Sequence, residues 1–424
     1  MALAPRPSRE RQGRRTGPRT PHAGPRTTDH GPRLLWGSPL PPTRSGVADY
    51  AAELLPHLAR ASEVTLLEPP GWSRPDDAPW LDGLAAVPHD AAAPERSVTL
   101  LHLGNNPYHL WVAQRLRASG GVVVLHDSVL HHLLVEEAAA SGAWDRFDEE
   151  LLEAHGAGGA AIAAGRRWGF SGRLDPFVFP ARRPYLMHAS AVIVHNALAA
   201  ADVARECPGI PVRRVPLCVG GLPAGDRAEW RARLGAGDGD LLMAHLGFLT
   251  RAKGLDVVLR AMVALGEAGV AARLAVVGEG SERGAFENVV SSAGLGERVR
   301  VWGYASADDL GGILDAADLG LVPRYPTAGE TSAAALRFLA SGTPVAVAGY
   351  GQFLELPPEA APRIPPGEAG VAELVRLAGR LARSRDGRRA SRRAAKEAWE
   401  SGGHEPSAAA VAMLAVVAEL SRVA

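Results

Sequence analysis

The 424-residue sequence has little that would cross-link it or hold it in a membrane. It contains two cysteines, Cys207 and Cys218, too few for a disulfide framework or a cysteine zinc site, so we expect a reducing cytoplasm. The longest apolar run, residues 408–418, is too short to span a bilayer, and no apolar segment marks a signal peptide. The sequence therefore predicts a soluble cytoplasmic protein, with peripheral contact to the inner face of a membrane left open.

The sequence also has no net charge and very few lysines. Basic and acidic residues number 46 each, so the formal charge is zero. Residues 1–33 hold eight arginines and two acidic residues, so the remainder is acidic and gives no reason to expect nucleic-acid binding. The sequence has two lysines, Lys253 and Lys396, on a background of arginine. A lysine retained against that background is a candidate functional residue.

The first 33 residues form a segment of their own. They are rich in Pro, Gly and Arg without hydrophobic periodicity, so ordering them would cost entropy that no buried surface offsets. We predict a disordered tail over residues 1–33. An extension without function and a segment that binds anionic lipid are both open interpretations.

From residue 34 onward, short apolar runs alternate with amphipathic stretches. Runs this short, flanked by Gly, Pro or Asp, predict interior strands, and their alternation with helices predicts a parallel sheet covered on both faces. In the first half we predict strands at 34–36, 64–67, 98–103, 122–125 and 192–194, with helices at 47–59, 109–118 and 128–141. In the second half we predict strands at 241–246, 274–277, 299–302, 319–322 and 345–347, with helices at 255–265, 282–293, 307–316 and 332–340.

These patterns predict an α/β protein of two doubly wound, Rossmann-like domains. The first would cover residues 34–220 and the second residues 221–400, with a C-terminal helix in residues 401–424. That helix places one apolar stripe along its length, which must pack against another element. The stripe consists of Val411, Leu414, Val417 and Leu420.

Ligands of doubly wound sheets bind beyond the carboxyl ends of the strands, so the loops that follow strands are informative. The loop 247–254 leaves a strand and opens a helix, placing Lys253 at a helix N-terminus. Free N–H groups and the helix dipole already favour an anion there, and a cation is mildly unfavourable without one. We therefore interpret Lys253 as a diphosphate-binding residue and not as an ordinary surface lysine.

A second loop, residues 326–332, also runs from a strand into a helix. Thr331 and Ser332 are natural N-caps, but their hydroxyls would equally suit a phosphate or a sugar hydroxyl. Glu330 is less simply explained by capping, because a carboxylate also accepts hydrogen bonds from sugar hydroxyls. The loop therefore indicates a phosphate and sugar site, with helix capping as the alternative for Thr331 and Ser332.

In the first half, Ser45 and Gly46 open a helix after the first strand and would let a ligand approach the backbone. No Gly-x-Gly-x-x-Gly spacing is present, so we do not expect a tight dinucleotide site. His126 ends another strand and would hydrogen-bond an acceptor or assist proton movement, although a structural histidine is nearly as good an interpretation. His131 and His132 are expected on a helix surface, with no third residue spaced to complete a metal site.

With these loops in hand, residues 34–424 resemble family 4 of the retaining glycosyltransferases, which have the two-domain GT-B fold. The resemblance rests on motifs that follow the family's order and that are individually weak. They lie at residues 39–50, 125–127, 192–196, 247–254, 276–280, 301–304, 316–318 and 339–345. The resemblance implies two domains facing each other across a cleft, with the last helix crossing back to the first domain.

The same resemblance implies roles for individual residues, with no metal and no cofactor besides the nucleotide-sugar substrate. Catalytic roles would fall to His126, Lys253 and Glu330. The acceptor side would consist of Ser45, His126 and Asp127. The donor side would consist of Gly46, Gly247, Lys253, Gly303, Tyr304, Glu330, Thr331, Ser332, Ala333 and Arg337.

Two departures from the family pattern stand out. Phe248 occupies a position where the family usually has arginine. The family also has a pair of glutamates, and Arg337 stands where the glutamate that meets the ribose would be. Glu330 is displaced by one residue from the position of the other glutamate. We hypothesise that Arg337, or Arg324 at a strand end, replaces the missing phosphate-binding arginine.

The expected activity is transfer of a sugar, with retention, from a nucleotide-diphosphate donor to a glycan, lipid or small-molecule acceptor. A lipid acceptor is weakly suggested by the tail and by Trp111 and Trp168. The alternatives are a degenerate GT-B protein that binds a nucleotide or partner without catalysis, and a sugar-nucleotide epimerase.

Overall fold

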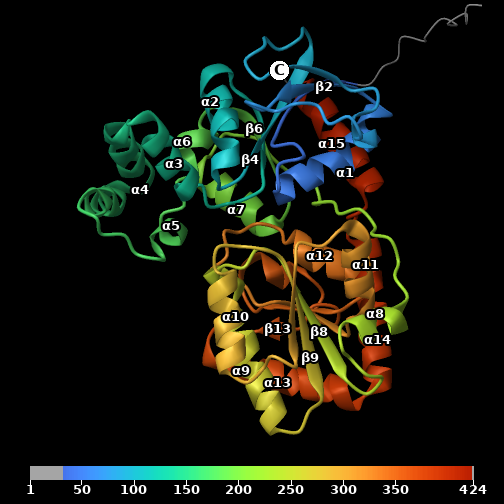
Figure 1. Cartoon of the computed structure of the whole chain (residues 1–424). Coiled ribbons are helices and arrows are strands. Elements are labelled where there is room, and N and C mark those ends of the chain that lie inside the picture. The colour runs from blue at the N-terminus through green and yellow to red at the C-terminus, as the bar shows by residue number, and fades with distance from the viewer. Residues whose placement is uncertain (1–31, 423–424) are drawn as a thin grey trace, which may run out of the picture.

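The computed structural model describes residues 32–422 and folds them into two lobes, each built on a parallel sheet (Figure 1). Most of the predicted tail, residues 1–31, lies outside the described residues. Arg33 is the first residue of the first strand, so the prediction of disorder was wrong for that residue.

The first lobe contains a seven-stranded parallel sheet in the order β3-β2-β1-β4-β5-β6-β7. Its strands are β1 Arg33–Gly37, β2 Glu63–Glu68, β3 Ala85–Pro88, β4 Ser97–Leu103, β5 Gly121–Leu125, β6 Ala189–Val194 and β7 Val212–Arg214. Its helices are α1 Gly46–Ala59, α2 Leu110–Ser119, α3 His131–Ser141, α4 Trp144–Arg167, α5 Asp175–Val178, α6 Arg183–Leu186 and α7 Ala197–Glu206.

The second lobe contains a six-stranded parallel sheet in the order β10-β9-β8-β11-β12-β13. Its strands are β8 Leu241–Leu246, β9 Ala272–Val277, β10 Val299–Gly303, β11 Leu319–Val322, β12 Val345–Ala348 and β13 Arg363–Ile364. Its helices are α8 Arg227–Arg233, α9 Leu255–Glu267, α10 Arg283–Ser292, α11 Ala307–Ala316, α12 Ala333–Ala340, α13 Glu368–Arg383 and α14 Arg385–Ser401. No helix within residues 32–422 is both long and apolar enough to cross a bilayer.

The interior strands owe their position to short, unbroken apolar runs. Leu34, Leu35 and Trp36 are consecutive in β1 and at most 1% exposed, which requires cover on both faces of the sheet. The strands absent from the sequence prediction, β3, β7 and β13, all lie at sheet edges. They are short and partly exposed, and so lack the continuous apolar run that identifies a central strand.

The last helix, α15 Pro406–Leu420, packs against α1 of the first lobe although it follows the second lobe in sequence (Figure 1). Its buried face is formed by Ala410, Met413 and Val417, whereas Val411 is 70% exposed. The predicted stripe was therefore wrong at Val411. The composition of this helix explains the error, because nearly every position is apolar and the periodicity does not single out one face.

Two further predictions about individual side chains were wrong. His131 lies on α3 but is fully buried, and its ring hydrogen-bonds the carbonyl oxygen of Phe179 at 2.8 Å, whereas His132 is exposed as expected. Trp111 is only 7% exposed and belongs to the core beside β4 and β5, so it lends no support to a lipid acceptor.

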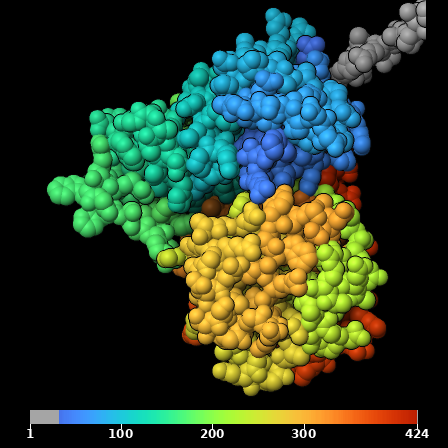
Figure 2. Space-filling view, in the orientation of Figure 1, coloured from blue at the N-terminus to red at the C-terminus, as the bar shows by residue number. Residues whose placement is uncertain are grey.

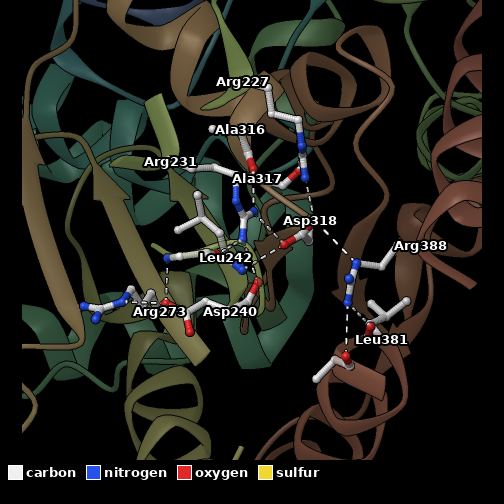
Figure 3. Close-up of polar contacts among 12 residues, drawn as sticks. Arg227, Arg231, Asp240, Leu242, Arg273, Ala316, Ala317, Asp318, Leu381 and Arg388 are labelled. Atoms are coloured by element: carbon white, nitrogen blue, oxygen red, sulfur yellow. Dashed lines mark hydrogen bonds and ion pairs between the residues drawn. The ribbon is translucent and has the colours of Figure 1, made fainter. Parts of the chain in front are cut away.

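A buried polar cluster joins α8 to the starts of β8 and β11 in the second lobe (Figure 3). Asp318, 4% exposed, lies just before β11 and accepts hydrogen bonds from Arg227, Arg231 and the backbone N–H of Leu242, at 2.6, 3.0 and 3.0 Å. Arg231 also donates to the Asp240 carbonyl oxygen at 2.7 Å. Asp318 thereby fixes α8 to the strand starts and leaves the opposite, carboxyl ends free to form a site.

Candidate active site between the lobes

The carboxyl ends of both sheets face a cavity of about 570 Å³ between the lobes. Loops after β1, β5 and β6 line it from the first lobe, and loops after β8, β10 and β11 line it from the second. Of the residues that the resemblance assigned to catalysis, donor binding or acceptor binding, all but Gly303 line this cavity. They are Ser45, Gly46, His126, Asp127, Gly247, Lys253, Tyr304, Glu330, Thr331, Ser332, Ala333 and Arg337.

Lys253 ends a short 3-10 turn, Arg251–Lys253, directly before α9. The next residue, Gly254, has a φ of +68°, and a Cβ there would lie 2.1 Å from the carbonyl oxygen of Pro323. A hydrogen bond of 2.9 Å from the Tyr325 N–H to the Ala252 carbonyl oxygen also ties the turn to the end of β11. Only glycine therefore allows the close packing that directs Lys253 into the cavity.

The Lys253 amine lies in an unusual electrostatic environment. Burial and the nearby Arg324 guanidinium lower its pKa to about 7, against a smaller opposing effect of the Asp127 carboxylate. Burial also lowers the pKa of Arg324 and raises that of Asp127. Two cations thus share a desolvated wall with the Asp127 and Glu330 carboxylates, and an additional anion near Lys253 would favour its charged form.

The loop between β11 and α12 carries Glu330, Thr331 and Ser332. The Ser332 hydroxyl accepts from the N–H of Ala335 at 3.2 Å and caps α12, as its sequence position suggested. The Thr331 hydroxyl instead accepts from Asn196 of the first lobe at 3.1 Å. Glu330 forms an ion pair with Arg324 and accepts from the Thr327 hydroxyl at 3.1 Å, so its carboxylate lies beside the cationic wall.

Arg337 and Arg324 occupy different parts of the cavity wall. Arg337 projects from α12 to the first lobe, where it forms an ion pair with Glu53 of α1 and donates to the Gly220 carbonyl oxygen at 2.7 Å. Arg324 is the arginine that influences the pKa of Lys253. Of the two arginines hypothesised to replace the missing one, Arg324 has the better position beside Lys253, whereas Arg337 bridges the lobes.

On the first lobe, His126 and Asp127 follow β5 and are both half-buried in the cavity wall. The Asp127 carboxylate accepts from the Asn105 N–H at 2.7 Å. His126 shares a hydrogen bond of 2.9 Å with His102, meets the Tyr50 ring edge to face, and lies at a tilt to the His195 ring. Burial, reinforced by the neighbouring histidines, holds the pKa of His126 well below its usual range. Its neutral imidazole suits hydrogen bonding to a hydroxyl better than proton abstraction.

The remaining predicted residues have simpler positions. Ser45 caps α1 by accepting from the Ala48 N–H at 3.1 Å, and nothing lies within 4 Å of a Cβ built on Gly46, so this turn leaves open space for a ligand. Gly303 has a φ of +87° and shapes the end of β10, while the following Tyr304 is 61% exposed at the cavity edge beneath Arg44.

Sequence reasoning missed two acidic residues of the cavity wall, Asp49 and Glu53. They lie four residues apart on α1, a spacing that places both on one helix face, and this signal was available in the sequence. Burial raises the pKa of Asp49 despite the nearby Arg337. Within residues 32–422, no group of three or more His, Cys, Asp or Glu side chains is arranged to hold a metal ion.

Comparisons with known proteins agree with this two-lobed arrangement. Over almost the whole chain the structure resembles sucrose-phosphate synthase from Thermosynechococcus elongatus, with a TM-score of 0.65 and 17% identity, covering 93% of this chain and 100% of that one. Anabaena HepE in complex with UDP-glucose aligns with a TM-score of 0.56 and 16% identity, covering 92% and 99%. The chain has the GT-B fold.

Sequence comparison adds a match confined to the second lobe. Residues 226–359 match the model of the glycosyl transferases group 1 family. The 2-deoxystreptamine glucosyltransferase of Streptomyces kanamyceticus is 29% identical over 144 residues, which cover 34% of this chain and 37% of that protein. The alignment thus spans about a third of the relative's length, and the family match includes the loops that carry Lys253, Arg324 and Glu330.

Proposed function

We propose that the chain is a glycosyltransferase that moves a sugar from a nucleotide-diphosphate donor to a hydroxyl group of an acceptor. The proposal rests chiefly on the juxtaposition of Lys253 and Arg324 with His126 and Asp127 across the cavity between the lobes. Two half-buried cations suit a diphosphate on the second lobe, and a neutral imidazole with a carboxylate suits a hydroxyl acceptor on the first. The cavity volume of about 570 Å³ lies within the range of small-molecule sites.

The chemistry requires that the negative charge growing on the leaving diphosphate be neutralised. Lys253, Arg324 and the first N–H groups of α12 supply positive charge at fixed positions in a desolvated site, where such charge is most effective. We therefore propose a reaction without a metal ion. The resemblance to family 4 favours retention of configuration, in which an oxygen of the leaving phosphate takes the proton of the acceptor hydroxyl. Glu330 and Asp127 would then position sugar and acceptor.

The donor class is supported by the solved relatives, because HepE is described in complexes with UDP and UDP-glucose. The acceptor is less constrained. The curated relative named for 2-deoxystreptamine acts on a polyhydroxylated small molecule, and glycans and lipid-linked sugars present the same nucleophile. We propose a hydroxyl-bearing acceptor of one of these kinds.

The test begins with a thermal-shift screen against UDP, GDP, ADP and dTDP, because ligand binding raises the stability of the native state. The sugar donors of the stabilising nucleotide are then incubated with pooled acceptors. Free nucleoside diphosphate and glycosylated product are measured by mass spectrometry. Nucleotide binding without transfer to any acceptor would favour a degenerate binding protein, and donor conversion without acceptor would favour an epimerase.

The variant Lys253→Ala provides the residue-level test. We expect it to lose transfer by at least about a hundredfold, the magnitude found when one preorganised charge is removed from an active site. Lys396→Ala is the matched control, because Lys396 is the other lysine and its side chain is 68% exposed on α14. Equal turnover of both variants would refute the assigned phosphate site.

A further inference from the structure

A histidine lies inside the buried strand β4, at a position to which the reaction proposed above assigns no role. His102 stands between Leu101 and Leu103, and all three side chains are fully buried. Its ring packs against that of Trp36 at a centroid distance of 3.9 Å. Burial holds the pKa of His102 well below its usual range, so the imidazole is neutral. Burying a polar ring costs stability unless hydrogen bonds compensate, so this histidine calls for an explanation that a leucine would not.

The ring of His102 makes one hydrogen bond within residues 32–422. This bond joins Nδ1 of His102 to Nε2 of His126 at 2.9 Å, while Nε2 of His102 is buried without a partner. His126 follows β5, the strand that pairs directly with β4, and lines the cavity between the lobes. The two lobes touch across this junction (Figure 2). His102 therefore connects the interior of the sheet to a residue of the cavity wall.

The direction of this hydrogen bond follows from what each ring can satisfy. A neutral imidazole carries one N–H and one bare nitrogen. If His126 were the donor, the proton of His102 would be on Nε2, which is buried with no acceptor in the part of the chain that the structure describes. If His102 donates from Nδ1, only a bare nitrogen is left without a partner. Orphaned buried N–H groups are rare in folded proteins, and this favours His102 as the donor.

We propose that His102 is a positioning residue that fixes the tautomer of His126. Because Nε2 of His126 accepts from His102, the proton of His126 lies on Nδ1, the ring nitrogen left for a ligand in the cavity. The Asp127 carboxylate also lines the cavity and supplies an acceptor. Together, the N–H and the carboxylate match the oxygen and the proton of one hydroxyl group. On the proposed function, on which this step rests, His126 therefore donates to a hydroxyl of a substrate and does not abstract its proton.

Nitrogen-15 NMR of the full chain with labelled histidine rings measures the tautomer directly, because protonated and bare ring nitrogens differ widely in chemical shift. Comparison with His126→Gln identifies the His126 signals among those of the 14 histidines. We expect His126 to be protonated at Nδ1 and bare at Nε2 in the ligand-free protein. A proton on Nε2 of His126 would overturn the proposal. The measurement needs no substrate, so it decides the proposal even if the chain transfers no sugar.

Two substitutions separate the hydrogen bond from the packing. In His102→Asn the amide nitrogen takes the place of Nδ1 as a donor, so His126 should keep its tautomer and kcat/KM for transfer should change by less than about threefold. His102→Leu fills the site but removes the donor. His126 should then lose its fixed tautomer, and kcat/KM should fall by about fivefold to tenfold, the contribution of one hydrogen bond. UDP affinity should be unchanged in both variants, because Lys253 and Arg324 of the second lobe are untouched.

His131→Leu is the matched control for the loss of a buried histidine. His131 is also fully buried in the first lobe, but its Nδ1 donates to the Phe179 carbonyl oxygen at 2.8 Å and it does not line the cavity. The control should leave both the His126 tautomer and kcat/KM unchanged. An unchanged His126 tautomer in His102→Leu, or an equal loss of kcat/KM in His102→Asn and His102→Leu, would overturn the proposal. If His102→Leu does not fold, the spectra of the unsubstituted chain and of His102→Asn decide.

Discussion

The buried Lys253 leads to a quantitative prediction about pH. Its pKa of about 7 in the free protein results from burial and from Arg324, which together outweigh the opposing effect of the Asp127 carboxylate. A bound diphosphate adds two negative charges nearby and must raise that pKa. Because the bound state has the higher pKa, affinity is fully present below pH 7 and is lost as pH rises towards the bound-state value.

The magnitude follows from the linkage relation. If the bound pKa exceeds about 9.5, the dissociation constant should increase by about 25-fold between pH 6.5 and 8.5, equivalent to about 1.9 kcal/mol. At pH 8, binding should take up about 0.9 proton per nucleotide. A nucleotide-sugar is the suitable ligand, because its diphosphate bridge does not titrate in this range.

Isothermal titration calorimetry in buffers of different ionisation enthalpy measures both quantities. The pKa values of His126 and His245 are lowered by burial, so these groups remain neutral over the whole range. Lys253→Arg is the control, because its side chain stays protonated and its affinity should not vary with pH. A flat profile and no proton uptake in the unsubstituted protein would refute the reasoning, and an unchanged slope in Lys253→Arg would assign the titration to another group.

Three further predictions concern the structure around the site. Gly254→Ala should lower the free energy of unfolding in urea by about 2–4 kcal/mol, because the new Cβ meets the Pro323 carbonyl oxygen. Gly71→Ala is the control: Gly71 also has a positive φ of +73° but open space around it, so the free energy of unfolding should fall by only about 1 kcal/mol. Asp318→Asn should lower the free energy of unfolding by about 3–5 kcal/mol, because the buried Arg231 loses its carboxylate partner. Asp386→Asn is the control, because its ion pair with Arg389 is exposed and its loss should leave the free energy of unfolding unchanged. Arg324→Ala should weaken UDP binding at least about tenfold, whereas Arg337→Ala should chiefly widen the cleft, as small-angle X-ray scattering would show. Unchanged nucleotide affinity in Arg324→Ala would exclude that residue from the phosphate site.

Local sequence signals were sufficient for the elements that form the centre of each sheet. The runs at 241–246 and 319–322 coincide with β8 and β11, because buried parallel strands leave a short apolar signature of their own. The helices α4, α7, α13 and α14 were missed, although α13 and α14 each have a well-defined apolar face whose spacing was available in the sequence. Their packing is decided by tertiary contacts that no local window contains.

In the candidate site, too, some residues could be predicted from local sequence and others could not. Lys253 was identifiable because its loop, its neighbouring glycines and its rarity all pointed to it. The different roles of Arg324 and Arg337 could not be predicted from the sequence. Both residues follow β11 within 20 residues, and only the contact of Arg337 with the other lobe distinguishes them. Glu53, which engages Arg337, lies 284 residues away in sequence. Contacts of that range depend on how the lobes meet, which strand and helix patterns do not encode.

The loop between β11 and α12, where we propose that the donor binds, belongs to the second lobe by sequence, yet the first lobe holds it in place. The N–H groups of Ser128 and Val129 donate to the Ala328 carbonyl oxygen at 2.8 and 3.1 Å, and Asn196 donates to Gly329 and Thr331. A Cβ on Gly329 would lie 2.7 Å from that of Ser128, so this approach requires glycine. Separation of the lobes would release these hydrogen bonds together and free the loop. Because the same loop presents Thr331 and Ser332 to the cavity, the proposed donor site would be complete only when the lobes are closed, and closure would also shield a reactive donor from water.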